Sequence, residues 1–464
     1  MLPLALFLGA VAAAALVRVA ASLGDFWLDE IWSWYNIAHL SAPWQVFTRI
    51  HLDNNHHLMS LLMYLMGPNV YWVIYRIPSV VAGVLSVVYA ARIAREYGRW
   101  AAGASVALVG GSYLFVHYSS EARGYALCVF FALFCYYHLR RYLLAPRAAS
   151  LVLFLVGAVL GILSHLEFLG FLLACALWLG SRTFRRSRSV LAVLATEAKL
   201  LAVPALAFAA LYFGNVRGQR IGGGNPEDPL QIAWAALSLA IGGPVQSQPQ
   251  VALGLVTIAL VIAGLVLAAR RDRDEAVFYG AVLVLAPLLQ AHFVTRELLQ
   301  VRYFLVPLAF LCLLLAHGVE WLAHHGRWGM AVSVVLLLGY LAGNGANINR
   351  LLCYGRGSYL AALTSMVEAT PGPVVTVSST HDSRAWATID YYRPYLHVAK
   401  TLTYVRTEQA PAHPPEWLII ESTDLQEAPA PTLTVPGAGD YQLVRDYPCA
   451  GLSGFAWAIY RRGE

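Results

Sequence analysis

Three carboxylates and several aromatic side chains follow the first apolar segment of this 464-residue chain. Asp25, Asp29 and Glu30 occur in the run 25–35, which also holds three tryptophans and a tyrosine. A carboxylate beside a lipid bilayer is costly to desolvate, so such residues usually bind an ion, relay protons or take part in a reaction. The segment is therefore predicted to have a chemical role.

Other segments supply groups that suit an anionic substrate whose reaction needs a base. The candidates are spread over the chain: His56, His57, Glu121, Arg123, His165 and Arg302. A guanidinium offers forked donors to phosphate oxygens, and a carboxylate can take the proton of an attacking hydroxyl. This chemistry requires elements that bring distant segments to one place.

The composition indicates that those elements are membrane helices. The chain is 59% hydrophobic and only 12% charged, with a mean hydropathy of +0.59, which is more apolar surface than a soluble core of this size would bury. The net charge of +6 mainly reflects how basic residues are distributed between the two sides of the membrane. It makes no case for nucleic-acid binding.

Eleven apolar runs approach or exceed the length that crosses a bilayer, roughly 20 residues. They lie near 2–23, 71–91, 100–116, 124–139, 150–164, 168–181, 200–213, 250–269, 276–291, 303–319 and 329–345. Arginine and lysine concentrate in alternate connections, which the positive-inside rule places in the cytoplasm. The residues near 25–35, 117–123 and 214–249, and the chain after about 346, are then expected on the outer side.

We expect a polytopic α-helical membrane protein of about 11 transmembrane helices with a small C-terminal extracytoplasmic α/β domain. The predicted division is a transmembrane catalytic domain at 1–345, with a first outer loop and interfacial helices at 25–70, and the α/β domain at 346–464. Short apolar runs predict strands at 372–378, 415–421, 441–447 and 454–461 and a helix at 383–392. The proline-rich stretches 410–415 and 428–436 are expected to be loops.

Two of the six cysteines, Cys353 and Cys449, fall in the expected outer domain. An oxidising compartment favours a disulfide between them, and two free thiols are the alternative.

Four motifs resemble those of the GT-C superfamily of membrane glycosyltransferases. They are the Asp29-Glu30 pair after the first helix, a polar motif before an interfacial helix, Tyr118-Ser-Ser-Glu-Ala-Arg-Gly-Tyr125, and Arg302-Tyr-Phe before a proline-containing span. The third of these, Tyr118–Tyr125, is the most specific. The resemblance covers roughly residues 1–320 in layout and is strongest to bacterial relatives of protein O-mannosyltransferases and to the aminoarabinose transferase of lipid A. Where the family often has His-Pro-Pro, this chain has His56-His57-Leu58.

The resemblance implies the transfer of a sugar from a polyprenyl-phosphate donor to an envelope glycan, lipid or protein acceptor. A single base acting in a direct displacement of phosphate would invert the anomeric configuration. The reaction is expected at the outer face of the bacterial cytoplasmic (inner) membrane, with the lipid part of the donor in the bilayer. Asp29 is the expected general base, with Glu30 as the alternative, and Arg123 and Arg302 are expected to clamp the phosphate. Further candidates are Glu121, which would orient Arg123 or the acceptor, and the substrate-binding set Tyr118, Tyr125, Tyr303, His56, His57 and His165.

Each assignment has a structural alternative. Arg302 could extend to the membrane edge, as Arg18 inside the first span is expected to do, and Asp25 or Glu30 could solvate a loop. A retaining reaction could pair Asp29 with Glu121. The sequence identifies no cofactor with certainty, and His56 and His57 with Asp29 or Glu121 could hold a divalent metal.

Two other classes of protein remain open at this point. A lipid-linked sugar flippase or transporter would place charges at mid-membrane depth, often in broken helices. A relative without activity would bind lipid only.

Overall fold

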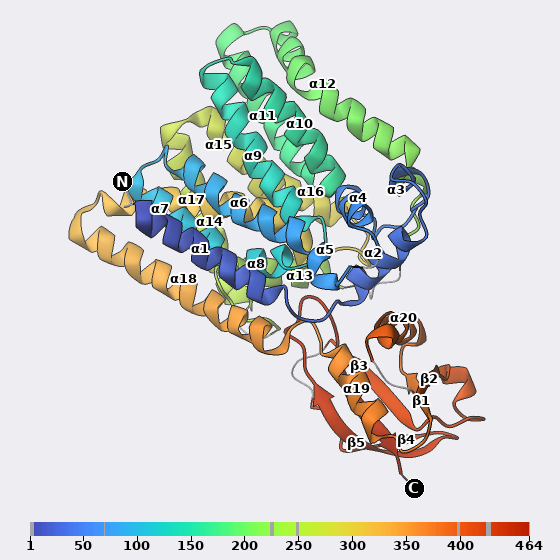
Figure 1. Cartoon of the computed structure of the whole chain (residues 1–464). Helices are drawn as coiled ribbons and strands as arrows, with labels where there is room; N and C mark the ends of the chain where they lie inside the picture. The colour runs from blue at the N-terminus through green and yellow to red at the C-terminus, as the bar shows by residue number, and fades with distance from the viewer. Residues whose placement is uncertain are drawn as a thin grey trace. The chain divides into compact units, whose positions relative to one another are not determined.

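Figure 1 shows the computed structural model, which describes residues 4–68, 70–222, 227–246, 250–396, 400–423 and 428–463. The chain divides into two compact units, one of residues 1–22 and 36–348 and one of residues 23–35 and 349–464. The short segment 23–35, which hydropathy groups with the first part of the chain, is therefore a part of the second unit.

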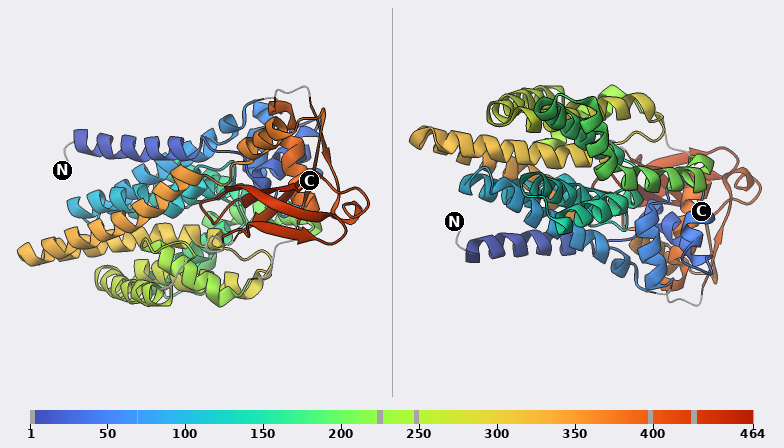
Figure 2. Two further views of the ribbon diagram at one scale, coloured as in Figure 1. Left: turned by 90° about the horizontal axis from the view of Figure 1, so that it is seen from below. Right: turned by 90° about the horizontal axis from the view of Figure 1, so that it is seen from above.

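The first unit is helical, and its long helices run roughly side by side (Figures 1 and 2). Its α-helices are α1 Leu4–Ala21, the end of α2 Leu28–Ala38, α3 Gln45–Thr48, α4 His57–Met66, α5 Trp72–Tyr75, α6 Ile77–Ala94, α7 Arg99–Gly110, α8 Tyr113–Ser119, α9 Tyr125–Leu144, α10 Ala148–Ser164, α11 Phe168–Ser187, α12 Val190–Gly214, α13 Pro229–Ala240, α14 Gln250–Arg271, α15 Arg273–Gly280, α16 Ala286–Phe293, α17 Leu305–Ala323 and most of α18 Gly326–Tyr354. Short 3₁₀ turns occur at η1 Val216–Gly218 and η3 Val301–Phe304, and the π-helical segment η2 Ala281–Leu285 joins α15 to α16.

Within the described ranges, eight helical stretches are long and apolar enough to cross a membrane, and the bent pair α7–α8 makes a ninth if it is one span. The two remaining runs expected as spans coincide with α10 and α11. The prediction of a multi-pass helical membrane protein is confirmed, and the expected number of eleven crossings was approximate.

The surface and the centre of this unit differ as expected for a protein in lipid. Leucine side chains of α1, α12 and α18 are exposed, such as Leu16, Leu206 and Leu336. Helix α17 is buried along most of its length and packs against α6, α7, α9 and α14. α17 is therefore the central helix of the bundle. Exposed apolar side chains are stable where lipid replaces water, so the outer helices are expected to face lipid.

Arg18 of α1 has a structural role at the break between α7 and α8. The side chain is fully buried, and its guanidinium donates hydrogen bonds to the carbonyl oxygens of Val109 and Gly110 at 3.0 and 3.1 Å. The last carbonyls of a helix lack partners within the helix, and a cation at this end satisfies both their hydrogen bonds and the helix dipole. The expectation that Arg18 extends to the membrane edge is therefore wrong.

The second unit contains a six-stranded sheet with strand order β2-β1-β3-β6-β5-β4. The strands are β1 Val374–Ser379, β2 Thr401–Tyr404, β3 Trp417–Ser422, β4 Thr432–Val435, β5 Gly439–Tyr447 and β6 Ala456–Arg462; α19 Tyr359–Ala369, α20 Asp382–Tyr392 and the turns η4 Arg393–Tyr395 and η5 Thr407–Gln409 complete the unit. β2, β1 and β3 are parallel, and the other pairs are antiparallel. The expected α/β domain, its four predicted strands and α20 are confirmed, but the stretch 428–436 holds β4 and is not only a loop.

The N-terminal part of this unit, residues 23–35, packs against α19 and α20. The hydroxyl of Tyr392 accepts a hydrogen bond from the Phe26 N–H at 2.6 Å and donates one to the Phe26 carbonyl at 3.0 Å. Asp25 Oδ2 accepts from the backbone N–H of Leu360 at 2.9 Å, in the first turn of α19. A carboxylate at a helix N-terminus is stabilising, so the role of Asp25 in this unit is that of a cap.

The expected disulfide is not formed in the structure. Cys353 is an exposed thiol near the end of α18, whereas Cys449 is a buried thiol. Burial raises the pKa of the Cys449 thiol. A sequence shows which cysteines share a compartment, but the bond also requires two side chains that point toward each other.

Candidate functional site

The ring of Tyr125 is the meeting point of two arginines from distant parts of the chain. The guanidinium carbons of Arg123 and Arg302 each lie 5.7 Å from the centre of this ring. Tyr125 is the first residue of α9 and is 1% exposed, and Arg302 comes from η3. A cation over an aromatic face is attracted by the ring and is thereby held in position.

Two histidines pack against the same tyrosine. The rings of His56 and His165 lie 4.8 and 5.0 Å from the Tyr125 ring, and 4.9 Å from each other. His56 precedes α4 and His165 follows α10, so four separate segments converge at one end of the helical unit (Figure 1).

Backbone hydrogen bonds determine which nitrogen of each imidazole carries the proton. The N–H of Gly124 donates to Nδ1 of His56 at 2.8 Å, and the N–H of Glu167 donates to Nδ1 of His165 at 3.1 Å. Because Nδ1 accepts in both rings, the neutral form of each has its proton on Nε2. Each ring is then a donor at its far edge.

The electrostatic environment keeps both imidazoles neutral. Burial lowers the pKa of His56 well below its usual range, and the Arg123 and Arg302 guanidiniums lower it further. Burial, followed by the same two arginines, lowers the pKa of His165 to about 3. The positive charge of this cluster therefore resides on the two guanidiniums, as suits an anion.

Polar groups from two other segments hold Arg123. Its guanidinium donates to the side-chain and main-chain oxygens of Asn54, and its carbonyl accepts from Ser79 Oγ at 3.0 Å. Arg123 itself is 3% exposed. Asn54 lies in the polar motif that precedes α4, but nothing in the sequence indicated that it would bind Arg123.

Glu121 is fully buried and is bonded to a neighbour one helical turn earlier. Its Oε1 lies 3.2 Å from Nε2 of His117, which is also fully buried. The ring of Tyr118 packs edge-on against His117 at 4.8 Å and against Tyr125 at 5.5 Å. This geometry connects Glu121 to the cluster around Tyr125 through aromatic contacts.

Tyr303 extends the cluster on the side of η3. Its ring lies 5.2 Å from the His165 ring. Glu167, which sequence reasoning missed, accepts a hydrogen bond from the Val306 N–H at 2.7 Å and so ties the start of α11 to the start of α17. That contact fixes η3, and with it Arg302, relative to His165.

His57 points to a different part of the unit from His56. Its Nε2 lies 2.9 Å from Oδ1 of Asn215, and its ring stacks on Phe47 at 5.7 Å. His56 is the N-cap of α4 and has non-helical backbone angles, whereas His57 is the first residue of the helix, so the two side chains leave the backbone in different directions. The structure thus brings together His56, Arg123, Tyr125, His165 and Arg302, with Tyr118 and Tyr303 at their edges, and directs His57 toward the end of α12.

The acidic residues of the segment 23–35 have different surroundings within the second unit. Glu30 is fully buried, and its Oε2 accepts from the Trp27 N–H at 3.2 Å, as an N-terminal capping carboxylate does. Asp29, one residue earlier in α2, is only partly buried. Of this pair, Asp29 is the carboxylate that remains accessible from solvent.

In the described part of the chain, no three His, Cys, Asp or Glu side chains form a group that could hold a metal ion. His56 faces Tyr125 and His165, His57 faces Asn215, and Glu121 faces His117. The histidines that the sequence offered as metal ligands therefore have separate surroundings.

A family model described as dolichyl-phosphate-mannose-protein mannosyltransferase matches residues 56–212, which carry His56, Arg123, Tyr125 and His165. This match confirms the predicted resemblance: over this range the chain resembles the protein mannosyltransferases of the GT-C superfamily of membrane glycosyltransferases. No curated protein sequence matches the chain closely.

Solved structures with a similar arrangement include ArnT and an oligosaccharyltransferase. ArnT from Cupriavidus metallidurans bound to undecaprenyl phosphate is 13% identical, with 99% of each chain covered and a TM-score of 0.49. The oligosaccharyltransferase of Archaeoglobus fulgidus in complex with zinc and sulfate is 12% identical, with 89% of this chain and 68% of that chain covered and a TM-score of 0.48. Likenesses this distant assign no substrate and no residue role to the present chain.

Proposed function

We propose that the protein is an inverting glycosyltransferase that moves a sugar from a polyprenyl-phosphate donor to an envelope acceptor at the outer face of the bacterial cytoplasmic membrane. The observation that carries the proposal is the position of the Arg123 and Arg302 guanidiniums, both 5.7 Å from the Tyr125 ring centre. Two forked donors held together at the end of a membrane bundle suit a phosphate that is attached to lipid.

The neutral histidines add to this phosphate site. His56 and His165 accept backbone hydrogen bonds at Nδ1, so each can donate through Nε2 without adding charge. Donors that are already in position stabilise the negative charge that grows on a leaving phosphate without further reorganisation. In this proposal Arg123 and Arg302 bind the phosphate, His56 and His165 contact its oxygens or the sugar, and Tyr118, Tyr125 and Tyr303 line the site.

Asp29 is the proposed general base. In the transfer step the acceptor oxygen attacks the anomeric carbon, the bond from that carbon to the phosphate oxygen breaks, and the hydroxyl proton passes to Asp29. Polyprenyl phosphate leaves as an anion that needs little protonation, so one carboxylate is sufficient and the anomeric configuration inverts. Partial exposure of Asp29 and the capping role of Glu30 favour Asp29 within the pair.

The alternative of a lipid-linked sugar flippase or transporter gains no support from Arg18. A transport pathway would present charges toward water or substrate at membrane depth. Arg18 is buried and donates instead to backbone carbonyls at the end of α7.

The experiment that tests the proposal uses full-length protein in lipid nanodiscs. Undecaprenyl phosphate should raise the unfolding temperature of the native protein. Undecaprenyl phosphate should raise the unfolding temperature of Arg302→Ala much less, because the variant lacks a charge-assisted hydrogen bond that contributes about 1.5–3 kcal/mol. Arg217, an exposed arginine of η1, provides the control variant Arg217→Ala.

Transfer is measured separately with radiolabelled lipid-linked sugars and membrane glycans from the source cells. Asp29→Asn should bind undecaprenyl phosphate like the native protein but lose turnover by about 10²–10⁴-fold, the usual contribution of a general base. Undiminished turnover in Asp29→Asn would exclude it as the base. Equal stabilisation of the native protein and Arg302→Ala by undecaprenyl phosphate would exclude the phosphate site.

A further inference from the structure

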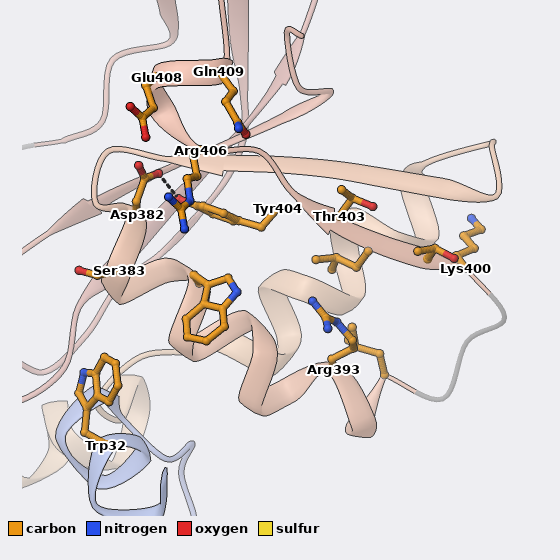
Figure 3. A pocket seen from close by; sticks show the side chains of 14 residues that line it. Trp32, Asp382, Ser383, Arg393, Lys400, Thr403, Tyr404, Arg406, Glu408 and Gln409 are labelled. Carbon is orange, nitrogen blue, oxygen red and sulfur yellow. Dashed lines mark hydrogen bonds between the residues drawn. The ribbon is translucent and has the colours of Figure 1, made fainter. Parts of the chain in front are cut away.

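The second unit contains a cavity of about 980 Å³ between α20, β2 and the loop that follows β2 (Figure 3). This volume is at the upper end of the roughly 300–1,000 Å³ found for small-molecule sites. One wall carries Trp32 of α2, and the loop wall carries Arg406, Glu408 and Gln409 (Figure 3). None of these residues belongs to the cluster around Tyr125.

The most prominent apolar group in the cavity wall is Trp386 of α20. It lies on the solvent side of that helix and is 45% exposed, whereas Ala385, Ala387 and Ile389 are buried. Its ring stacks on Tyr35 at 6.5 Å with an angle of 11° between the planes. An exposed tryptophan held flat by a second aromatic ring presents a rigid face on which a ligand can lie.

Asp382 fixes the polar side of the cavity. Its Oδ1 accepts from the hydroxyl of Tyr404 at 2.7 Å and from the N–H and the hydroxyl of Thr407, both at 3.0 Å. The bond to Tyr404 crosses from α20 to the end of β2 (Figure 3). The loop with its hydroxyl, amide and charged side chains is thereby held in place.

Charged side chains of both signs line the cavity. Of the lining cations, Arg393 pairs with Asp390 at 3.1 Å, and Lys400 donates to the carbonyls of Val367 and Thr370 at the end of α19. Exposed Arg406 directly precedes η5, exposed Glu408 lies within it, and the two carry opposite charges. A strongly anionic ligand would meet carboxylates and a strongly cationic one would meet guanidiniums, so a neutral ligand with many hydrogen-bonding groups fits this lining best.

We infer that this cavity binds a neutral oligosaccharide, with one sugar ring on the face of Trp386 and its hydroxyls toward the side chains after β2. Sugars offer an apolar ring face and a polar edge, which match the two kinds of wall. Trp32 and Asp29 are three residues apart on α2 and so project from the same side of that helix. Because an acceptor must lie near the general base, and Asp29 is the proposed base, we assign the saccharide as the acceptor. This assignment rests on the proposed function.

Binding is tested without donor, on full-length protein in nanodiscs, with maltotetraose, mannotetraose and chitotetraose as neutral probes and tetragalacturonate as the charged probe. Ligand-detected NMR should show saturable binding of at least one neutral tetrasaccharide and weaker binding of tetragalacturonate. Trp386→Ala should weaken the binding about tenfold, because one aromatic stacking face is lost, and Trp386→Phe should restore most of it.

Trp328 of α18, which is 73% exposed and lies outside the cavity, gives the matched control Trp328→Ala. The unfolding temperature of each variant shows whether it is folded. No saturable binding of any neutral tetrasaccharide, or equal binding by Trp386→Ala and Trp328→Ala, overturns the inference. Binding of undecaprenyl phosphate is measured in parallel. If undecaprenyl phosphate binds and the saccharides do not, the inference about the cavity is wrong and the proposed donor site is retained. If only the saccharides bind, the cavity is supported and the proposed transferase function is contradicted.

Discussion

The backbone N–H of Gly124 donates a 2.8 Å hydrogen bond to Nδ1 of His56. This contact joins the start of α4 to the start of α9 and directs the Nε2–H of His56 away from Gly124. It is possible because residue 124 has no side chain: a Cβ there would lie 2.0 Å from the Ser164 carbonyl oxygen and 2.6 Å from His56 Nδ1. Gly124 therefore belongs to the candidate site although it carries no functional group.

Gly124→Ala is expected to displace His56 and weaken the proposed phosphate site. Because a shift of about 1 Å in a catalytic group can cost about 10²-fold, kcat/KM for transfer should fall by about one to two orders of magnitude. The control is Gly318→Ala on α17, where a Cβ has nothing within 4 Å. If the two variants transfer sugar equally well, the Gly124–His56 contact has no part in the reaction.

The depressed pKa of His165 predicts how stability depends on pH. An unfolded histidine takes up a proton below a pH of about 6.5, whereas folded His165 does so only near pH 3. The unfolded state thus binds more protons in this window, and the unfolding free energy decreases as pH falls through it. Above this pH window, His165 is neutral in both states and does not make the unfolding free energy depend on pH.

The measurement is the unfolding temperature between pH 8 and pH 5 for the native protein and His165→Gln. The variant removes the titrating group, so its unfolding temperature should decline less steeply with acidification. Parallel curves for the two proteins would contradict the assignment of a neutral His165. His413, an exposed histidine of the second unit, gives the control His413→Gln, which should follow the native curve.

Glu320 is predicted to stabilise the bundle by capping α7. Its Oε2 accepts from the Ala101 N–H at 2.8 Å, in the first turn of that helix, and 93% of the residue is buried. Glu320→Ala should lower the unfolding free energy by about 1–2 kcal/mol, the usual cost of a lost cap. Thermal unfolding in nanodiscs measures this, with Glu197→Ala of α12 as a control for loss of a carboxylate that caps no helix.

Cys353 and Cys449 should differ in reactivity. A membrane-impermeant maleimide is expected to label Cys353 in the native protein, because this thiol is exposed, and to label Cys449 only after unfolding. Burial raises the pKa of Cys449, so its reactive thiolate is also scarcer. Mass spectrometry without reductant decides the point, since a cross-linked peptide containing both residues would restore the disulfide.

Apolar runs predicted the elements of this chain well because hydropathy reports which segments are buried or face lipid. For this reason, short apolar runs predicted the strands β1, β3, β5 and β6. β2 and β4 are only four residues long and expose alternate residues, so they carry little of that signal. The membership of residues 23–35 in the second unit depends on contacts such as that between Phe26 and Tyr392, which lie far apart in the sequence.

The site was predictable by residue type more than by arrangement. Arginine and histidine near the ends of predicted spans indicated an anion site, and Arg123 and Arg302 do meet. Tertiary packing and the starts of helices decide three features that the sequence did not show. They are the central position of Tyr125, the binding of Asn54 to Arg123, and the different directions of His56 and His57. A single sequence without contacts gives no information on such directions.

The Arg18 contact with α7 constrains how the protein is assembled during synthesis. α1 leaves the ribosome long before Val109 and Gly110 do. Until those residues are synthesised, the Arg18 guanidinium lacks the two carbonyl oxygens to which it donates in the folded protein. α1 can pack against α6 before α7 is inserted, but its hydrogen bonds to α7 form only afterwards. A nascent chain that stops before residue 109 would hold α1 less firmly than one that extends beyond the break.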